Sequence, residues 1–116
     1  MKVILVNGSP REKGCTYTAL CEVAGALEKN GIELEVPAER TVMIGDTTGC
    51  IGCNVCLKNG RCFVDDPVNE FVEKAKTADG FVFGSPVHYA AASGAITSFL
   101  DRAFYGKGNV FAGKPG

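Results

Sequence analysis

The stretch that decides the fold of this chain is VILVNGSP, residues 3–10. Its first four residues form a continuous apolar run rich in β-branched side chains, which is typical of a strand covered on both faces in a parallel sheet. Residues 80–86, GFVFGSP, repeat this pattern. Each copy places Gly-Ser-Pro at the carboxyl end of a buried strand and before a helix, so we expect both loops to face one ligand site.

The sequence between the two copies predicts a helix and a further strand. Apolar residues recur at i, i+3, i+4 and i+7 over residues 20–27, with Val23 among them, and Asn30-Gly31 supplies a helix stop. Residues 32–36 are predicted to form a second strand. Residues 41–61 have no clear period and four glycines, so we expect a loop with a short helix.

Two more helices are predicted further along. Asp66 and Pro67 suit the N-cap and first position of one helix, and Ser93 suits the N-cap of the last. The alternation of strands and helices predicts an α/β fold with right-handed crossovers and a parallel sheet. In the flavodoxin-like strand order 2-1-3-4-5, the first and third strands are neighbours at the point where a ligand crevice opens.

Residues 7–16 have the composition of an anion-binding loop. Backbone N–H groups at a helix N-terminus favour a bound anion. Ser9 and Thr16 can donate hydroxyl hydrogen bonds, and Arg11 can pair with a phosphate. The Walker lysine pattern and G-x-G-x-x-G are absent, which argues against a nucleotide triphosphatase and an ordinary dinucleotide fold. The alternative is a tight turn in which Gly and Pro serve backbone geometry alone.

These motifs resemble those of a known family. Residues 8–16, GSPREKGCT, are similar to the phosphate loop of the NADPH-dependent FMN reductase and iron-sulfur flavoprotein group, and the resemblance continues through residues 78–87 and 98–102. It implies a flavodoxin-like three-layer fold that binds FMN. The residues expected by resemblance to hold the FMN phosphate are Ser9, Arg11, Gly14, Cys15 and Thr16, with Cys15 contributing its backbone N–H.

The second loop is expected, by the same resemblance, to contact the isoalloxazine ring and ribityl chain. Its residues are Ser85, Pro86, Val87, His88 and Tyr89. His88 is the single histidine and invites a general-acid interpretation, because its unperturbed pKa lies near neutrality. A loop residue that contacts cofactor or solvent is the simpler interpretation, since the sequence offers no partner that would orient the ring.

Four of the six cysteines follow the pattern C-x2-C-x2-C-x5-C, at Cys50, Cys53, Cys56 and Cys62. This compact spacing favours a [4Fe–4S] cluster, because zinc ribbons more often use two separated C-x2-C pairs. The resemblance implies a cluster that exchanges electrons with FMN, although members of the wider group can keep similar cysteines as thiols. Cys21 is expected to be a small buried apolar residue of the first helix.

Two charged pairs invite functional interpretations that we do not favour. Asp101 and Arg102 are neighbours on a predicted helix and cannot face each other, so we expect Arg102 to pair elsewhere in a structural role. Asp65 and Asp66 could suggest a metal site. A helix N-cap explains Asp66 with fewer assumptions, and Asp65 can reinforce the helix dipole.

Length and charge narrow the class of protein. The 116 residues are assigned to one domain, 1–116, a flavodoxin-like FMN-binding domain with a cysteine-rich insertion at about 47–63. The net charge of −1 and the scattered Lys and Arg provide no basic field for nucleic acid. With no apolar stretch of membrane-spanning length and no signal pattern, a cytoplasmic location with reduced thiols is expected.

The family pattern would continue beyond residue 116 with a fourth strand, a further flavin loop, a helix and a fifth strand. We therefore expect a C-terminally incomplete fold that lacks the last two strands, with the strand at 80–84 as an unprotected edge. Homo-oligomerisation is expected by resemblance, because flavins in this group commonly lie near subunit interfaces.

The leading functional hypothesis is an FMN-dependent oxidoreductase or electron-transfer flavoprotein. It would pass electrons from NAD(P)H or a reduced protein to a small acceptor or the [4Fe–4S] cluster, with the flavin and no side chain carrying the chemistry. The alternatives are a non-catalytic zinc-binding module on an α/β scaffold and an inactive fragment of a longer flavoprotein.

Overall fold

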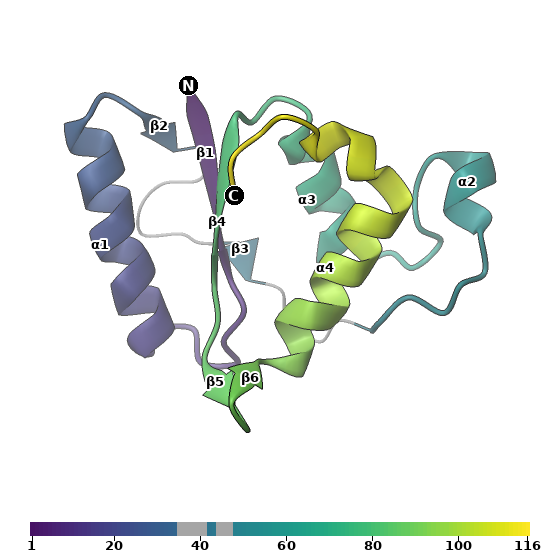
Figure 1. The fold of residues 1–116 in the computed structure, drawn as a ribbon, viewed down its shortest axis with the longest axis horizontal. Helices are drawn as coiled ribbons and strands as arrows, with labels where there is room; N and C mark the ends of the chain where they lie inside the picture. The colour runs from purple at the N-terminus through teal and green to yellow at the C-terminus, as the bar shows by residue number, and fades with distance from the viewer. Residues whose placement is uncertain (35–41, 44–47) are drawn as a thin grey trace.

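The computed structural model describes residues 1–34, 42, 43 and 48–116. Figure 1 shows a sheet seen edge-on, with helix α1 (Cys15–Lys29) on one face and helices α3 (Pro67–Ala75) and α4 (Gly94–Lys107) on the other. The three layers and the parallel strands confirm the predicted α/β class and are consistent with a flavodoxin-like fold.

Strand β1 (Lys2–Asn7) lies at the centre of the sheet. Strand β4 (Gly80–Gly84) runs parallel to it along one edge, from Val3 to Asn7. Strands β2 (Glu33–Leu34) and β3 (Val42–Met43) also pair with β1 in parallel, β2 at its start and β3 at its end, and must therefore occupy the opposite edge. The predicted neighbourhood of the first and third strands, β1 and β4, is thus confirmed.

The second strand was only partly captured by the sequence. Residues 33 and 34 of the predicted strand at 32–36 pair with β1, while residues 35 and 36 lie outside the described residues. The prediction of loop at 41–61 was wrong for β3, which adds a second short pairing to β1, and right for the short helix, α2 (Val55–Asn59).

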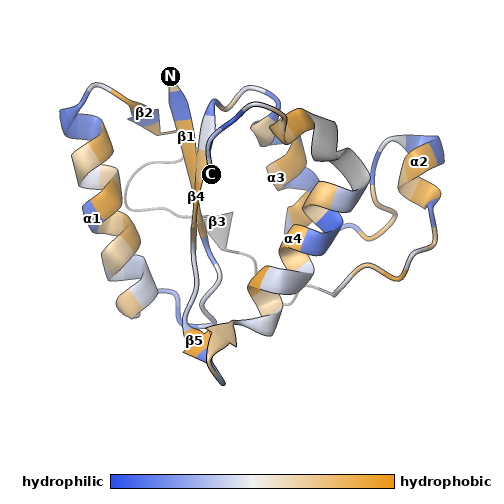
Figure 2. Cartoon of the chain, in the orientation of Figure 1, coloured by the Kyte–Doolittle hydropathy of each residue, from blue (hydrophilic) through white to orange (hydrophobic). Residues whose placement is uncertain are grey.

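The core is divided by the sheet because side chains alternate along a strand. On β1, Val3 and Leu5 pack with α1, whereas Ile4 and Val6 pack with α3 and α4. In Figure 2 the apolar strands β1 and β4 lie between α1 on one side and α3 and α4 on the other. Phe71 of α3 is fully buried at the centre of an aromatic cluster that holds Phe81, Phe83, Phe99 and Phe111.

The predicted helix ends are confirmed where the structure can test them. The Asp66 carboxylate accepts a hydrogen bond from the Val68 N–H at 3.1 Å, and Pro67 opens α3. Ser93 caps α4 by accepting from the Ile96 N–H at 3.2 Å. On α1, Val23 is 38% exposed, so its predicted place on the apolar face was wrong, and Cys21 is half-buried rather than buried.

A small hairpin follows β4. Strands β5 (Val87–His88) and β6 (Ala91–Ala92) pair antiparallel, and both residues between them, Tyr89 and Ala90, have positive φ values. Two adjacent positive φ values are the pattern of a type I′ turn, which glycine and asparagine usually occupy. Figure 1 places this hairpin beside the carboxyl ends of β1 and β4.

The C-terminal residues return to the sheet after the short helix η1 (Gly108–Phe111). The carbonyl oxygen of Pro115 accepts a hydrogen bond from the Phe81 N–H at 3.0 Å. The expectation of an unprotected β4 edge is therefore corrected at Phe81, where the last residues cover it. Among the described residues, no helix combines the length and apolar character needed to cross a membrane.

Candidate functional site

The two Gly-Ser-Pro loops are joined directly to each other. The Gly8 N–H donates to the Gly84 carbonyl oxygen at 2.7 Å, extending the β1–β4 pairing by one step. The Ser93 hydroxyl donates to the Gly8 carbonyl oxygen at 3.0 Å, so the start of α4 is tied to the first loop. A Cβ on Gly8 would lie 2.8 Å from Ile96 Cβ, which leaves room for glycine alone.

The first loop is shaped by its own side chains. Asn7, fully buried at the end of β1, accepts the Ser9 N–H on its Oδ1 at 2.9 Å. The Ser9 hydroxyl oxygen in turn accepts the Arg11 N–H at 3.1 Å. Each bond spans two residues, as in Asx- and Ser-turns, so the loop conformation is fixed locally. Ser9 is buried and keeps its hydroxyl hydrogen as a donor, while the Arg11 side chain is exposed.

The N-terminus of α1 opens onto this loop. Gly14 is the N-cap, and no side chain among the described residues caps the helix. Its first turn carries no acidic residue, so the N–H groups of this turn have the positive partial charge of a free helix start. Cys15 is exposed and Thr16 half-buried at this end. Ser9, Arg11 and Gly14 thus lie in the loop that follows β1, and Cys15 and Thr16 open the helix that follows this loop.

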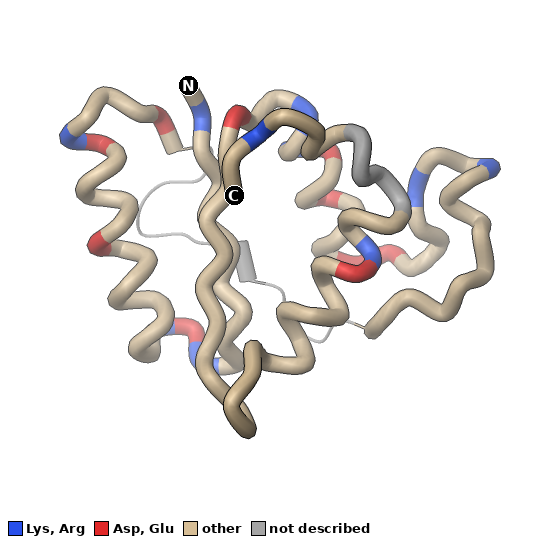
Figure 3. The backbone as a smooth tube through the Cα atoms, in the orientation of Figure 1, with Lys and Arg blue, Asp and Glu red and all other residues tan. Residues whose placement is uncertain are grey.

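The second loop lies beside the first. Ser85 accepts the Ser93 N–H on its hydroxyl oxygen at 2.9 Å, which ties the start of the loop to the N-cap of α4. Ser85 and Pro86 are half-buried, whereas Val87, His88 and Tyr89 are exposed. Within the described part of the chain, no hydrogen bond orients the His88 ring. The hairpin carries no Lys, Arg, Asp or Glu, as Figure 3 shows.

The cysteine-rich segment forms a second candidate site on the α4 side of the molecule. Cys50, Cys53, Cys56 and Cys62 all line one cavity of about 190 Å³. Its other walls include the apolar side chains of Ile51, Phe63 and Val64. Among the described residues, no group of three or more potential ligand side chains is gathered closely enough to hold a metal ion. The four thiols therefore share a cavity without already forming a coordination shell.

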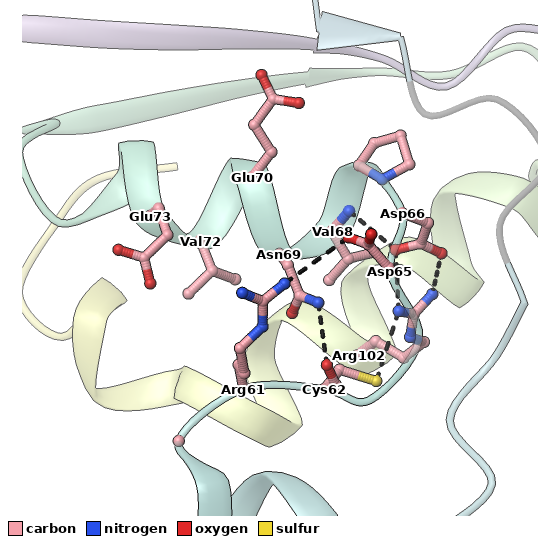
Figure 4. Close-up of a pocket in the computed structure, with 12 residues that line it drawn as sticks. Arg61, Cys62, Asp65, Asp66, Val68, Asn69, Glu70, Val72, Glu73 and Arg102 are labelled. Carbon is pink, nitrogen blue, oxygen red and sulfur yellow. Dashed lines mark hydrogen bonds and ion pairs between the residues drawn. The ribbon is translucent and has the colours of Figure 1, made fainter.

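Arg102 of α4 holds both ends of this segment, and Figure 4 shows it beside Asp66 and Cys62. Its Nη1 donates to the Thr48 carbonyl oxygen at 3.3 Å, and its Nη2 donates to the Val64 carbonyl oxygen at 3.2 Å. Nη2 also donates to Cys62 Sγ at 3.5 Å. Arg102 also forms a two-point ion pair with Asp66, in which Nη2 donates to Oδ1 at 2.9 Å. The expectation that Arg102 pairs away from Asp101 in a structural role is confirmed.

The Arg102 guanidinium is deeply buried, with a side-chain exposure of 2%. The hydrogen bonds that Arg102 donates to Asp66 raise the pKa of Arg102 above its ordinary value, against the opposing effect of burial. The side chain therefore stays charged at any working pH. Its Nε is buried without a hydrogen-bond partner among the described residues.

Other contacts hold the same segment. The Asn69 amide nitrogen, on α3, donates to the carbonyl oxygens of Cys62 and Val64, each at 3.0 Å. The Tyr105 hydroxyl, on α4, reaches Asn54 Oδ1 at 3.2 Å. A further cavity of about 430 Å³ lies beside these contacts, between the segment and the start of α3 (Figure 4). Arg61 and Asp65 form an exposed ion pair on its wall at 3.7 Å.

Sequence reasoning missed the residues that support each site. Asn7 shapes the first loop, and Asn69 fixes the cysteine segment from seven residues away. The position of Asn7, between a buried strand and Gly-Ser-Pro, was a usable signal for an Asx-turn. Asn69 gave no such signal, because an asparagine inside a predicted helix does not indicate which carbonyl groups it will reach.

A buried parallel sheet with two glycine loops at the carboxyl ends of adjacent strands is the ligand-binding architecture of doubly wound α/β proteins. Comparison with known proteins specifies the class. The family model for NADPH-dependent FMN reductase matches residues 1–116, and this chain belongs to that family.

Several curated relatives carry the name iron-sulfur flavoprotein. One from Methanocaldococcus jannaschii is 38% identical over 105 residues, which cover 89% of this chain and 52% of the relative. One from Archaeoglobus fulgidus is 31% identical over 117 residues, covering 100% of this chain and 52% of the relative. One from Methanosarcina thermophila is 31% identical over 110 residues, covering 89% and 52%. The chain thus spans about half the length of these relatives.

Proposed function

We propose that this chain is the FMN-binding part of a flavin-dependent oxidoreductase or electron-transfer flavoprotein. The observation that carries the proposal is the pair of glycine loops, locked together by the Gly8–Gly84 hydrogen bond at 2.7 Å. Family membership supports FMN as the ligand. When bound, FMN supplies reversible electron and hydride chemistry, so the protein has to bind, orient and shield it.

The first loop is proposed to hold the phosphate. The uncapped start of α1 offers N–H groups at Cys15 and Thr16, and Ser9 offers a hydroxyl donor held in place by the Arg11 N–H. The exposed Arg11 side chain would close over the phosphate with a charge-assisted hydrogen bond. The Asn7 turn keeps these donors in position before the ligand arrives.

The second loop is proposed to contact the ring and ribityl chain through Ser85, Pro86, Val87, His88 and Tyr89. The support is positional, because Ser85 is tied to Ser93 and the hairpin projects from the same edge of the sheet. Tyr89 is fully exposed and would cover an apolar ring surface or contact another subunit. The expected homo-oligomer would place such a subunit there, and sedimentation would test this. The cytoplasmic location stays a prediction.

The cysteine segment is proposed to hold a [4Fe–4S] cluster through Cys50, Cys53, Cys56 and Cys62. Four thiols on one mainly apolar cavity are a suitable donor set, and the relatives' names favour iron and sulfide over zinc. When bound, the cluster supplies one-electron chemistry. NAD(P)H or a reduced protein is the proposed electron donor and a small molecule or the cluster the proposed acceptor.

The first experiment is an absorbance spectrum of the purified protein before and after dithionite, with iron, sulfide and zinc measured on the same sample. Flavin bands that bleach on reduction are expected. A colourless protein that contains zinc would instead identify the zinc-module alternative. Failure to bind added FMN, with binding restored in a longer chain, would identify an inactive fragment.

A second experiment tests the phosphate loop. Arg11→Gln should weaken FMN binding about 10- to 100-fold, because a charge-assisted hydrogen bond contributes about 1.5–3 kcal/mol. Binding of riboflavin, which has the same ring without the phosphate, should not change. Arg61→Gln is the matched control, since Arg61 lies in the cysteine segment. Equal loss of FMN and riboflavin binding would contradict the assignment.

A further inference from the structure

The two ends of the cysteine segment, residues 48–64, lie at a single side chain. Thr48 precedes the first proposed ligand by two residues, and Val64 follows the last by two. Arg102 bonds to the carbonyl oxygen of each, at 3.3 and 3.2 Å. One guanidinium therefore holds both ends of the segment.

The same guanidinium reaches a proposed ligand atom. Nη2 lies 3.5 Å from Cys62 Sγ, within the range for a hydrogen bond to sulfur. Asn69 also holds this part of the segment, but its bonds go to carbonyl oxygens and it reaches neither Thr48 nor the sulfur. Among the described residues, Arg102 alone joins both ends of the segment to a thiol.

The ion pair with Asp66 fixes the guanidinium itself. Asp66 caps α3, so the carboxylate is held by the Val68 N–H on one side and by Arg102 on the other. The Arg102 side chain is 2% exposed and that of Asp66 13%, so neither is free to turn into solvent. The buried Nε has no hydrogen-bond partner among the described residues, and it is a remaining donor on a residue that lines the cysteine cavity.

We propose that Arg102 is the positioning residue of the cysteine site: it closes the segment at Thr48 and Val64, orients Cys62, and donates to the Cys62 sulfur when a cluster is bound. Of these roles, only the hydrogen bond to the sulfur of a bound cluster rests on the proposed [4Fe–4S] site. Hydrogen bonds to ligand sulfurs raise the reduction potential of such clusters, and groups that orient ligands typically change metal affinity 10- to 100-fold.

The test compares Arg102→Gln with Arg61→Gln in two states of the protein. Without a cluster, amides of residues 48–64 should exchange hydrogen about tenfold faster or more in Arg102→Gln, because the segment opens more often when its ends are no longer held. After anaerobic loading with ferrous iron and sulfide, Arg102→Gln should release iron to a chelator about 10–100 times faster, and its midpoint potential should fall. Arg61→Gln should match the wild type in all three measurements, because its side chain is exposed and pairs only with Asp65 among the described residues.

Two variants guard against a simple loss of folding. Asp66→Asn keeps an N-cap residue but removes the ion pair that fixes the guanidinium, so its iron release should be faster than that of the wild type and no faster than that of Arg102→Gln. The double variant Asp66→Asn/Arg102→Gln leaves no buried charge unpaired, so it should fold and still release iron as fast as Arg102→Gln.

The outcomes separate the two proposals. If the wild type takes up no iron and sulfide, the cluster proposal fails, while hydrogen exchange still tests the closing of the segment by Arg102. If the wild type takes up iron but both Arg102 variants keep its exchange rates, iron release and potential, the role of Arg102 is overturned. Faster exchange with unchanged iron release and potential would overturn its role towards the bound cluster.

Discussion

Replacing Gly8 by alanine tests how closely the two loops have to approach. The new Cβ would lie 2.8 Å from Ile96 Cβ and 3.0 Å from the Gly84 carbonyl oxygen. Carbon atoms attract at separations of about 3.5–4.0 Å, so the first contact is strongly repulsive. The second involves backbone, which cannot move aside without disturbing the Gly8–Gly84 hydrogen bond.

The expected loss follows from these contacts. Overpacking of this kind typically costs about 1–3 kcal/mol, and a lost internal hydrogen bond adds about 0.5–1.5 kcal/mol. Gly8→Ala should therefore lower the free energy of unfolding by about 1.5–4.5 kcal/mol, measured by urea denaturation. FMN binding, followed by flavin fluorescence, should weaken as well, because the loops would be forced apart.

Gly25 supplies the matched control. It lies inside α1, and no heavy atom of the described residues outside its own helix backbone and chain neighbours lies within 4 Å of a Cβ built on it. Gly25→Ala should raise the free energy of unfolding by about 0.5–1 kcal/mol, because alanine loses less conformational freedom in a helix. If both variants shifted stability in the same direction, the close approach of the loops would not be the cause, and the reasoning would be refuted.

Three further substitutions probe other parts of the structure. Ser93→Ala removes the N-cap of α4 and the hydroxyl bond to Gly8, and should lower the free energy of unfolding in urea by about 0.5–2 kcal/mol. Asp66→Ala leaves the buried Arg102 charge unpaired and should lower the free energy of unfolding in urea by about 3–5 kcal/mol. A loss below about 1 kcal/mol would mean that water reaches the guanidinium and would contradict its burial. Phe71→Ala should cost about 3–5 kcal/mol in thermal and urea unfolding, since its ring lies at the centre of the aromatic cluster, and an unchanged midpoint would contradict that packing.

Local signals in the sequence predicted much of the fold. The apolar runs that became β1 and β4 bury both faces, so composition alone was enough to identify them. Asp66 and Pro67 likewise start α3 through contacts within the first turn of the helix, so the local sequence was enough to predict this helix start. Val23 was misplaced because its spacing matches the apolar stripe, while the face that α1 buries is narrower than that stripe.

Features that depend on distant partners could not be predicted in the same way. Strand β3 has only two residues, and its pairing with β1 becomes visible only when the sheet is assembled. The β5–β6 turn uses Tyr89 and Ala90 where glycine or asparagine is usual, so it carried no turn signal. Arg102 contacts Asp66, Cys62 and Thr48, at sequence separations of 36, 40 and 54 residues, and no local pattern encodes such a set.

The separation of 40 residues between Cys62 and Arg102 also sets an order of events during synthesis. A ribosome adds about 5–20 residues per second, so the last cysteine of the segment is made about 2–8 s before the arginine that closes it, and the other three are made earlier still. Throughout that interval the thiols belong to an open stretch of nascent chain. For the proposed cluster to assemble, those thiols have to stay reduced until α4 folds onto the segment.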